Sequence, residues 1–175
     1  GLSTAIHLAS AGLRVVLLER DRVGRHASSA NAGGVRRLGR ALPEIPLAVA
    51  ALEQWHRIEE LVDDTCGFSE SAQIKVAEDQ AGLVALEQRS QAVQETGFDH
   101  EQMIDAATLH HMLPHVAKHC VGGLIVQGDG HADPFATVQA FYRKALSLGV
   151  QILEGASVTG VAQDKGIWQI STSSA

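Results

Sequence analysis

Residues 1–34 read GLSTAIHLASAGLRVVLLERDRVGRHASSANAGG, and the elements that they predict decide the fold. Small and apolar residues at helical spacing predict a helix over residues 1–11, which Gly12 would end. Residues 14–18, of which the last four form the apolar run VVLL, predict a buried strand, and the acid Glu19 stands at its end. A loop rich in glycine, alanine and serine follows. This order of helix, strand, acid and small-residue loop is typical of a dinucleotide-binding unit.

The dinucleotide-binding unit that this order predicts is incomplete. Its fingerprint starts with a strand and the motif G-x-G-x-x-G, and Gly1 stands where the third glycine belongs. Gly1 precedes Glu19 by 18 residues, close to the roughly 20 that the fingerprint requires. We therefore expect a fragment that lacks about ten residues before Gly1, comprising one strand and two glycines. The architecture also stops short at residue 175, so we expect both ends to be missing.

Composition and charge exclude several classes of function. The net charge is -6 and the aromatic fraction is 4%, which argues against a nucleic-acid-binding surface. No apolar run reaches the roughly 18 residues of a membrane span, and residues 1–18 lack the basic start of a signal peptide. Cys66 and Cys120 lie far apart without a C-x-x-C spacing, which predicts free, buried thiols in a reducing, cytoplasmic compartment.

The remainder of the chain continues with helices and strands. Helices are predicted over residues 47–63, 81–95, 109–112 and 134–148. Strands are predicted over residues 73–78, 121–126, 150–153, 157–162 and 166–172, the last two as a hairpin or meander. Asp79 and Asp133 are candidate N-caps, and two prolines predict an extended connection over residues 36–46. The fold class is therefore α/β.

Four motifs, in order along the chain, are similar to those of a known family. They are Gly1–Glu19, Ala27-Ser28-x-x-Asn31-Ala32-Gly33, Gly130-x-x-Asp133-Pro134, and Gly149-Val150-x-Ile152-x-Glu154 with Val158-x-Gly160-Val161. On these residues the chain resembles the FAD-dependent amine and D-amino-acid oxidoreductases, the family of glycine oxidase, sarcosine oxidase and D-amino-acid dehydrogenase. The resemblance implies a Rossmann-like α/β domain that binds FAD, without its first strand, interleaved with a truncated α+β substrate domain. The FAD-binding domain would comprise residues 1–66 and 131–175, and the substrate domain residues 67–130.

The resemblance also implies which residues bind FAD. They are Gly1, Glu19, Arg20, Ser28, Asn31, Ala32, Gly33, Gly34 and Val158. Glu19 would hold the adenosine ribose, while Arg20 and the backbone of Val158 would lie near the adenine. The small-residue loop would line the pyrophosphate and the isoalloxazine, because glycine-rich backbone can approach an anion closely. The helix that starts at Gly1 would point its positive dipole end at the pyrophosphate.

The activity that the resemblance implies is the oxidation of an amine. In this family the substrate gives a hydride to the flavin, and water hydrolyses the imine that results. The substrate would be an amino acid or a secondary amine, and the electrons would pass to oxygen or to an electron-transfer chain. A dehydrogenase of this kind would be cytoplasmic and peripheral to the inner membrane. No catalytic residue is assigned, and we expect the fragment to bind FAD weakly or not at all and to be inactive by itself.

Two alternatives to this activity remain open. A nicotinamide-dependent Rossmann dehydrogenase would share the pattern of residues 1–34, but its strands and helices would keep alternating after residue 46. A truncated gene product, or a flavoprotein subunit that only binds a partner, would retain the family's motifs without activity. Turnover of an amine by the fragment alone would exclude this second alternative.

Several further residues have both a functional and a simpler interpretation. Arg36 and Arg37 could form bidentate contacts with a substrate carboxylate or with the flavin, whereas most such arginines are solvated. Asp129 is interpreted as a turn residue. Trp55 and Trp168 stand on apolar stripes and are expected in the core.

The histidines suggest a metal site but do not predict one. His110, His111, His115 and His119 are interpreted as surface residues. Pro114 breaks the helix that they would share, and no cysteine or carboxylate completes a clear ligand set. His131 lies in a turn and is given no catalytic role.

Overall fold

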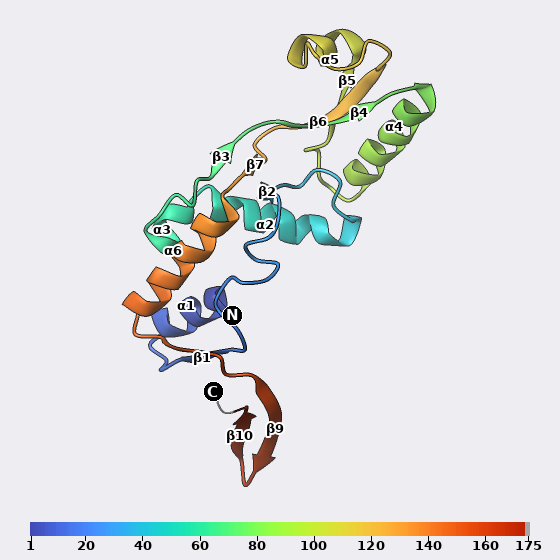
Figure 1. Ribbon diagram of the computed structural model, residues 1–175. Coiled ribbons are helices and arrows are strands. Elements are labelled where there is room, and N and C mark those ends of the chain that lie inside the picture. The colour runs from blue at the N-terminus through green and yellow to red at the C-terminus, as the bar shows by residue number, and fades with distance from the viewer. Residues whose placement is uncertain (174–175) are drawn as a thin grey trace. The chain divides into compact units, whose positions relative to one another are not determined.

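The computed structural model describes residues 1–173, which form two compact units (Figure 1). Unit 1 contains residues 1–33, residues 58–67 and the described residues from Asp133 onward, and unit 2 contains residues 34–57 and 68–132. These units are defined by packing, which groups residues 34–57 with unit 2. The expected domains 1–66, 67–130 and 131–175 concern cofactor and substrate binding, and they stay a prediction.

Unit 1 is built on two short parallel strands. Strand β1 (Val16–Glu19) pairs with strand β8 (Gln151–Glu154). Helix α1 (Leu2–Ser10) precedes β1, helix α6 (Pro134–Ser147) precedes β8, and the two helices contact each other. The residues that these helices bury are Ala5, Ile6, Val138, Ala140 and Ala145. The predicted succession of helix and strand is confirmed in both halves of the unit.

The start of α6 follows directly from its sequence. Asp133 is the N-cap, and its Oδ1 accepts hydrogen bonds from the N–H groups of Phe135 at 2.8 Å and Ala136 at 2.9 Å. Pro134 occupies the first turn, where its missing N–H group costs no hydrogen bond. A side-chain cap of this kind stabilises a helix by about 1 kcal/mol, so Asp133 fixes where α6 begins.

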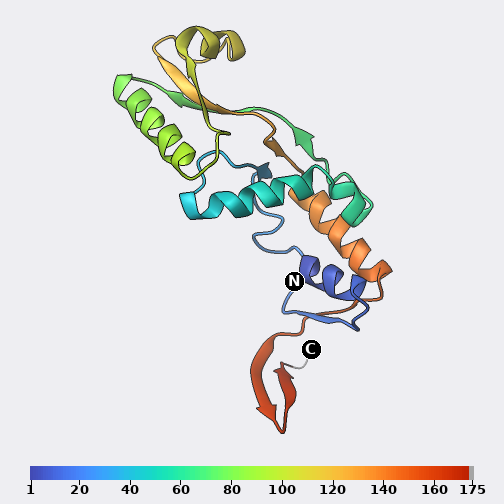
Figure 2. The same cartoon turned by 180° about the vertical axis from the view of Figure 1, so that it is seen from behind.

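The chain leaves β8 into the predicted hairpin, formed by strands β9 (Val158–Asp164) and β10 (Ile167–Thr172). The hairpin extends away from helices α1 and α6 of the same unit in both views (Figures 1 and 2). Every residue of β10 is exposed, and the Trp168 side chain is 64% exposed. The prediction that Trp168 belongs to the core is therefore wrong, because its apolar stripe lies on a ribbon of only two strands.

Unit 2 combines two small antiparallel sheets with three helices. Its strands are β2 (Gly34–Val35), β3 (Ser69–Glu70), β4 (Gln73–Ala77), β5 (Gln102–Asp105), β6 (Gly122–Val126) and β7 (Gly130–His131). Its helices are α2 (Ile45–Trp55), α4 (Gln80–Glu95) and α5 (Ala106–Met112). The strand orders are β4-β6-β5 and β2-β7-β3, so β6 and β7 are the central strands. All five residues of β6 are buried, as expected for the apolar run that predicted it.

Two apolar clusters hold unit 2 together. In the first, α4 packs on the sheet of β4, β5 and β6, where the two views place it alongside the strands (Figures 1 and 2). Its buried members are Leu38, Ala77, Leu86, Leu124 and Val126. The second cluster contains Val35, Leu52 and Ala132. Trp55 packs against this cluster, with its ring 5.6 Å from that of Phe68, in agreement with its predicted place in the core.

The predicted helix over residues 47–63 is wrong in its bounds. The chain forms two helices there, α2 and α3 (Ile58–Val62), separated by a short turn where it passes from unit 2 to unit 1. The extended connection over residues 36–46 is also shorter than predicted. Pro43 and Pro46 each occupy the first turn of a helix, the 3₁₀ turn Leu42–Glu44 and α2, where proline is well tolerated.

Candidate functional site

The first turn of α1 is open toward an anion. Gly1 is the N-cap and provides no side-chain hydrogen bond, and the first turn contains no acidic residue. The N–H groups at such a helix start have no partner within the helix and carry the positive end of its dipole. Gly1 also lies against β1, since a Cβ on Gly1 would be 3.4 Å from Cδ1 of Leu17. A phosphate group can therefore bind at this helix start more readily than at the start of a helix that a carboxylate side chain already caps.

Glu19 ends β1 at the edge of the parallel strand pair. Its Oε1 accepts a hydrogen bond from the Asp21 N–H at 2.9 Å, and within residues 1–173 its Oε2 has no hydrogen-bond partner. Its backbone carbonyl accepts from the Ala156 N–H at 2.9 Å. Beside it in register stands Glu154, whose Oε1 accepts from the Val23 N–H at 2.8 Å. The Glu19 carboxylate is thus fixed in place with one oxygen available for a hydroxyl donor.

The residues after Glu19 form a small charged cluster at the surface. Arg20 Nε lies 3.5 Å from Asp21 Oδ2, and the Arg20 side chain is 66% exposed. His26 Nε2 lies 2.6 Å from the same Asp21 oxygen. The hydrogen bond with the His26 ring lowers the pKa of Asp21 below its ordinary value, outweighing the opposite effect of burial. Arg20 is therefore an exposed cation, and its ion pair with Asp21 is long and open to solvent.

The small-residue loop has a defined internal structure. Asn31 donates from Nδ2 to the carbonyls of Ala27 at 3.2 Å and Ser28 at 3.0 Å, and its Oδ1 accepts from the Gly33 N–H at 2.8 Å. Gly33 is buried with a φ of +71°, a conformation that residues with a side chain rarely adopt. Ser28 and Ala32 are exposed. Asn31 therefore holds the loop in shape, and Gly33 allows the backbone to turn. The structure of the loop by itself thus accounts for an asparagine and a glycine at these two positions.

Helix α6 positions the start of this loop. Gly24 has a φ of +78°, and a Cβ there would come within 2.6 Å of Val138 Cγ1 and 2.8 Å of Ser29 Oγ. Only glycine lets the backbone pass this close to the helix. Gly24 is one of the small residues of the predicted loop, but the sequence gives no sign of its contact with α6.

The remaining two predicted residues lie at strand ends. Val158 begins β9, and its side chain is 47% exposed. Gly34 begins β2 and belongs to unit 2, whereas the other predicted cofactor residues all belong to unit 1. Unit 1 therefore contains the helix start, the strand-end acid, the loop and the first residue of β9 that were predicted together.

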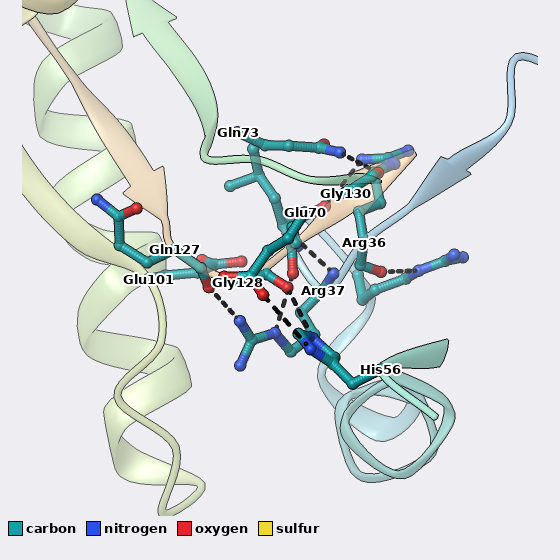
Figure 3. A network of polar contacts seen from close by, with 12 residues as sticks. Arg36, Arg37, His56, Glu70, Gln73, Glu101, Gln127, Gly128 and Gly130 are labelled. Carbon is teal, nitrogen blue, oxygen red and sulfur yellow. Dashed lines mark hydrogen bonds and ion pairs between the residues drawn. The ribbon is translucent and has the colours of Figure 1, made fainter. Parts of the chain in front are cut away.

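Unit 2 contains a second polar site that the sequence did not predict (Figure 3). Asp129 is completely buried. Its Oδ2 accepts from the backbone N–H groups of Arg37 at 2.9 Å and Leu38 at 3.1 Å, and its Oδ1 accepts from Arg37 Nε at 3.0 Å. Arg37 also donates from Nη2 to the carbonyl of Gln127. Asp129 therefore anchors residues 37–38 from the turn before β7, a larger role than that of a simple turn residue.

A second buried acid lies in the same network. The Glu101 side chain is completely buried and pairs with Arg89 of α4, with Oε2 2.8 Å from Arg89 Nε. Glu101 Oε1 accepts from the Gly39 N–H at 2.9 Å, and Arg89 Nη2 donates to the carbonyl of Arg40 at 2.6 Å. Burial disfavours the charged form, but the hydrogen bonds from Arg89 and Gly39 outweigh it and lower the pKa of Glu101. Glu101 is thus held as a carboxylate.

Beside this network lies a shallow cavity of about 300 Å³. It is lined by Arg37, Val49, Leu52, Glu53, His56 and Gly128. His56 Nδ1 lies 3.4 Å from Glu70 Oε2, and its Nε2 lies 3.2 Å from the carbonyl oxygen of Gly128 (Figure 3). The contacts of the ring therefore join the end of α2 to β3 and to the turn before β7.

The histidines singled out in the sequence form no metal site in the described part of the chain. Residues 1–173 contain no group of three or more histidine, cysteine or acidic side chains placed to hold a metal ion. His110 Nε2 instead lies 3.2 Å from the carbonyl oxygen of Cys120. Cys66 and Cys120 are free and buried, as predicted. Among the same residues, no helix is both long and apolar enough to cross a bilayer.

Comparisons with known proteins agree on one family. The sequence pattern that defines the FAD dependent oxidoreductases matches residues 1–175. A glycine oxidase from Bacillus licheniformis is 25% identical over 181 residues, which cover 99% of this chain and 47% of that protein. The mitochondrial dimethylglycine dehydrogenase of Homo sapiens is 26% identical over 177 residues, covering 98% of this chain and 20% of that protein.

The fold agrees with a solved structure. The crystal structure of glycine oxidase from Geobacillus kaustophilus superposes with a TM-score of 0.86 at 23% identity, over 98% of this chain and 48% of that one. The chain thus spans about half the length of the glycine oxidases and a fifth of the dimethylglycine dehydrogenase. The predicted α/β fold class is confirmed.

Proposed function

The chain belongs to the family of FAD-dependent oxidoreductases, and from this we propose that its protein oxidises the C–N bond of an amino acid or secondary amine. FAD supplies the acceptor for the hydride, while the protein binds and orients cofactor and substrate. The observation that supports the FAD-binding part of the proposal is the pairing, within unit 1, of an open helix start with a strand-end carboxylate.

These features of unit 1 fit the chemistry of FAD. The uncapped N–H groups at the start of α1 suit the pyrophosphate, because they are donors at a positive dipole end with no acid beside them. The free Oε2 of Glu19 suits a ribose hydroxyl, which needs an acceptor. Arg20 and Val158 would lie at the adenine. Ser28, Asn31, Ala32 and Gly33 of the loop, together with Gly34 at the start of β2, would line the pyrophosphate and the isoalloxazine.

The substrate that we propose carries a carboxylate next to its amine. The curated relatives are named for glycine and dimethylglycine, which both have these two groups. Of the adjacent arginines, Arg37 is already engaged by Asp129 and the Gln127 carbonyl. Arg36 is exposed and forms no ion pair within residues 1–173, and its Nη1 donates only to the Leu38 carbonyl, at 2.8 Å. Arg36 is therefore the guanidinium that can receive a substrate carboxylate.

Family membership argues against the nicotinamide-dependent alternative, since the matching family uses FAD. The final electron acceptor, oxygen or an electron-transfer chain, and a cytoplasmic location belong to the proposal as expectations. Whether residues 1–175 turn over an amine by themselves stays a prediction, and we expect that they do not.

The experiment is an anaerobic titration of the FAD-loaded full-length protein with glycine, N,N-dimethylglycine and D-alanine. The oxidised flavin's visible absorption band should bleach with at least one of them. Propionate, which has the carboxylate but no amine, serves as the control and should leave the band unchanged. If dithionite bleaches the band and no amine does, the proposed reaction is wrong.

A further inference from the structure

The five residues Arg36–Arg40 of unit 2, which read RRLGR, are held by two buried acids. The consecutive N–H groups of Arg37, Leu38 and Gly39 do not bond to a neighbouring strand. The first two donate to the Asp129 carboxylate and the third to the Glu101 carboxylate. Both carboxylates are completely buried, so this segment is fixed by charge-assisted hydrogen bonds that water does not weaken.

The segment in turn holds the Arg36 side chain. Arg36 Nη1 donates to the Leu38 carbonyl at 2.8 Å, and the Leu38 N–H is one of the groups bound to Asp129. The same nitrogen also lies beside Gly39, since a Cβ on Gly39 would be 3.8 Å from Arg36 Nη1. Arg36 thus rests on two residues that the buried acids fix.

We infer that Asp129 and Glu101 are positioning residues that orient the Arg36 guanidinium for a carboxylate-bearing amine. The inference rests on the proposed function and deepens it, because it names the groups that set substrate specificity without touching substrate. Each acid also binds an arginine, Asp129 binding Arg37 and Glu101 binding Arg89. The two acids are thereby neutralised, which leaves the positive charge of Arg36 available to the substrate.

The first test substitutes glycine in the segment itself. Gly39 has a φ of +70°, so Gly39→Ala strains the backbone and places a methyl group beside Arg36 while both acids remain. Gly97→Ala is the matched control in the same unit, since Gly97 has a φ of +88° with nothing within 4 Å of the added Cβ. Both variants carry the same kind of backbone strain, and only Gly39→Ala adds a methyl group in contact with Arg36.

The readout compares two substrates of the FAD-loaded full-length protein, N,N-dimethylglycine and its carboxylate-free counterpart trimethylamine. Gly39→Ala should raise KM for N,N-dimethylglycine about tenfold, as expected from weakening one charge-assisted hydrogen bond. Its kcat, its KM for trimethylamine and its flavin absorption spectrum should equal those of Gly97→Ala. Equal effects of the two variants on N,N-dimethylglycine would overturn the inference.

Asp129→Asn gives a second, independent test. It should raise KM for N,N-dimethylglycine selectively, and hydrogen exchange should show faster exchange of the Arg37 and Leu38 amides. An unchanged exchange rate or an equal loss with both substrates would overturn the inference. If Asp129→Asn does not fold, the comparison of Gly39→Ala with Gly97→Ala decides alone. A wild-type protein that oxidises no amine at all overturns the proposed function, whereas an active one without a selective effect overturns only the positioning role.

Discussion

Removing the charge of Glu101 should destabilise the protein strongly, although the substitution Glu101→Gln changes almost no volume. Glu101 is completely buried and accepts from Arg89 Nε at 2.8 Å, from Arg89 Nη2 at 3.0 Å and from the Gly39 N–H at 2.9 Å. A glutamine oxygen can still accept two of these bonds, as Oε1 does in the wild type. The amide nitrogen can accept none, so the bond from Arg89 Nε is lost and Arg89 is left without its counter-ion.

The magnitude follows from the burial of the pair. Breaking a buried ion pair by removing one partner costs about 3–5 kcal/mol in free energy of unfolding. The Arg89 side chain is 23% exposed, so water compensates part of the loss, and it keeps its hydrogen bond to the Arg40 carbonyl. We therefore expect the lower end of this range, about 3 kcal/mol. In a domain of this size that corresponds to a fall in Tm of about 6–12 °C.

The effect should depend on pH in a defined direction. The folded-state pKa of Glu101 lies below its ordinary value. A carboxyl group with a lowered pKa stabilises the folded state at pH values above its ordinary pKa, which is about 4.3 for glutamate. This contribution is lost as the pH falls through the pKa of the group in the folded state. The difference between wild type and Glu101→Gln should therefore be constant near neutral pH and shrink only at acidic pH.

The assay is urea unfolding followed by circular dichroism, at neutral and at acidic pH. Glu87→Gln is the control, because Glu87 is an exposed acid on α4, the helix that carries Arg89. It should change the free energy of unfolding by less than about 0.5 kcal/mol. A Glu101→Gln protein as stable as this control at neutral pH would refute the reasoning about the buried pair.

Three further predictions concern other sites. Gly24→Ala should destabilise unit 1, because the added Cβ would lie 2.6 Å from Val138 Cγ1 and the φ of +78° is strained; a thermal melt that matches wild type would contradict this. Asp133→Ala should cost about 1 kcal/mol in a denaturant titration and Asp133→Ser much less, because serine can still cap α6, so equal losses would speak against capping. The His100 ring should titrate below the ordinary histidine range in an NMR titration, because burial lowers its pKa. The folded state should therefore lose stability as the pH falls through the ordinary histidine range, where His100 gains a proton only in the unfolded chain. An ordinary pKa for His100 would contradict this prediction.

The sequence predicts those parts of the fold whose signals are local. Asp133 and Asp79 are N-caps as expected, and the Asp79 carboxylate accepts from the Gly82 N–H at 2.7 Å. Strand β1 follows from the continuous apolar run of residues 15–18, although Val16 is 53% exposed and the strand is not buried as predicted. Strand β8 follows from the apolar residues among positions 150–153. By contrast, β2, β3 and β7 contain two residues each, which is too short for any periodicity.

The polar network of unit 2 could not be predicted in the same way. Acidic residues are rarely buried, so Asp129 and Glu101 are expected at the surface when only their neighbours in sequence are known. Their partners Arg37 and Arg89 are distant in sequence, and only the fold brings them together. The cofactor residues are a different case, because Glu19 and the small-residue loop are contiguous with the elements that position them. Their roles toward FAD stay a prediction.

The most direct test of the central proposal is the affinity of the full-length protein for FAD, measured by fluorescence titration, with Glu19→Ala beside wild type. Losing a hydrogen bond to a charged acceptor costs about 1.5–3 kcal/mol, so Kd should rise about 10- to 150-fold. Asp164→Ala, which removes an exposed acid at the end of β9 in the same unit, should leave Kd unchanged. A Glu19→Ala protein that binds FAD as tightly as wild type would contradict the assignment of this strand-end acid to the ribose.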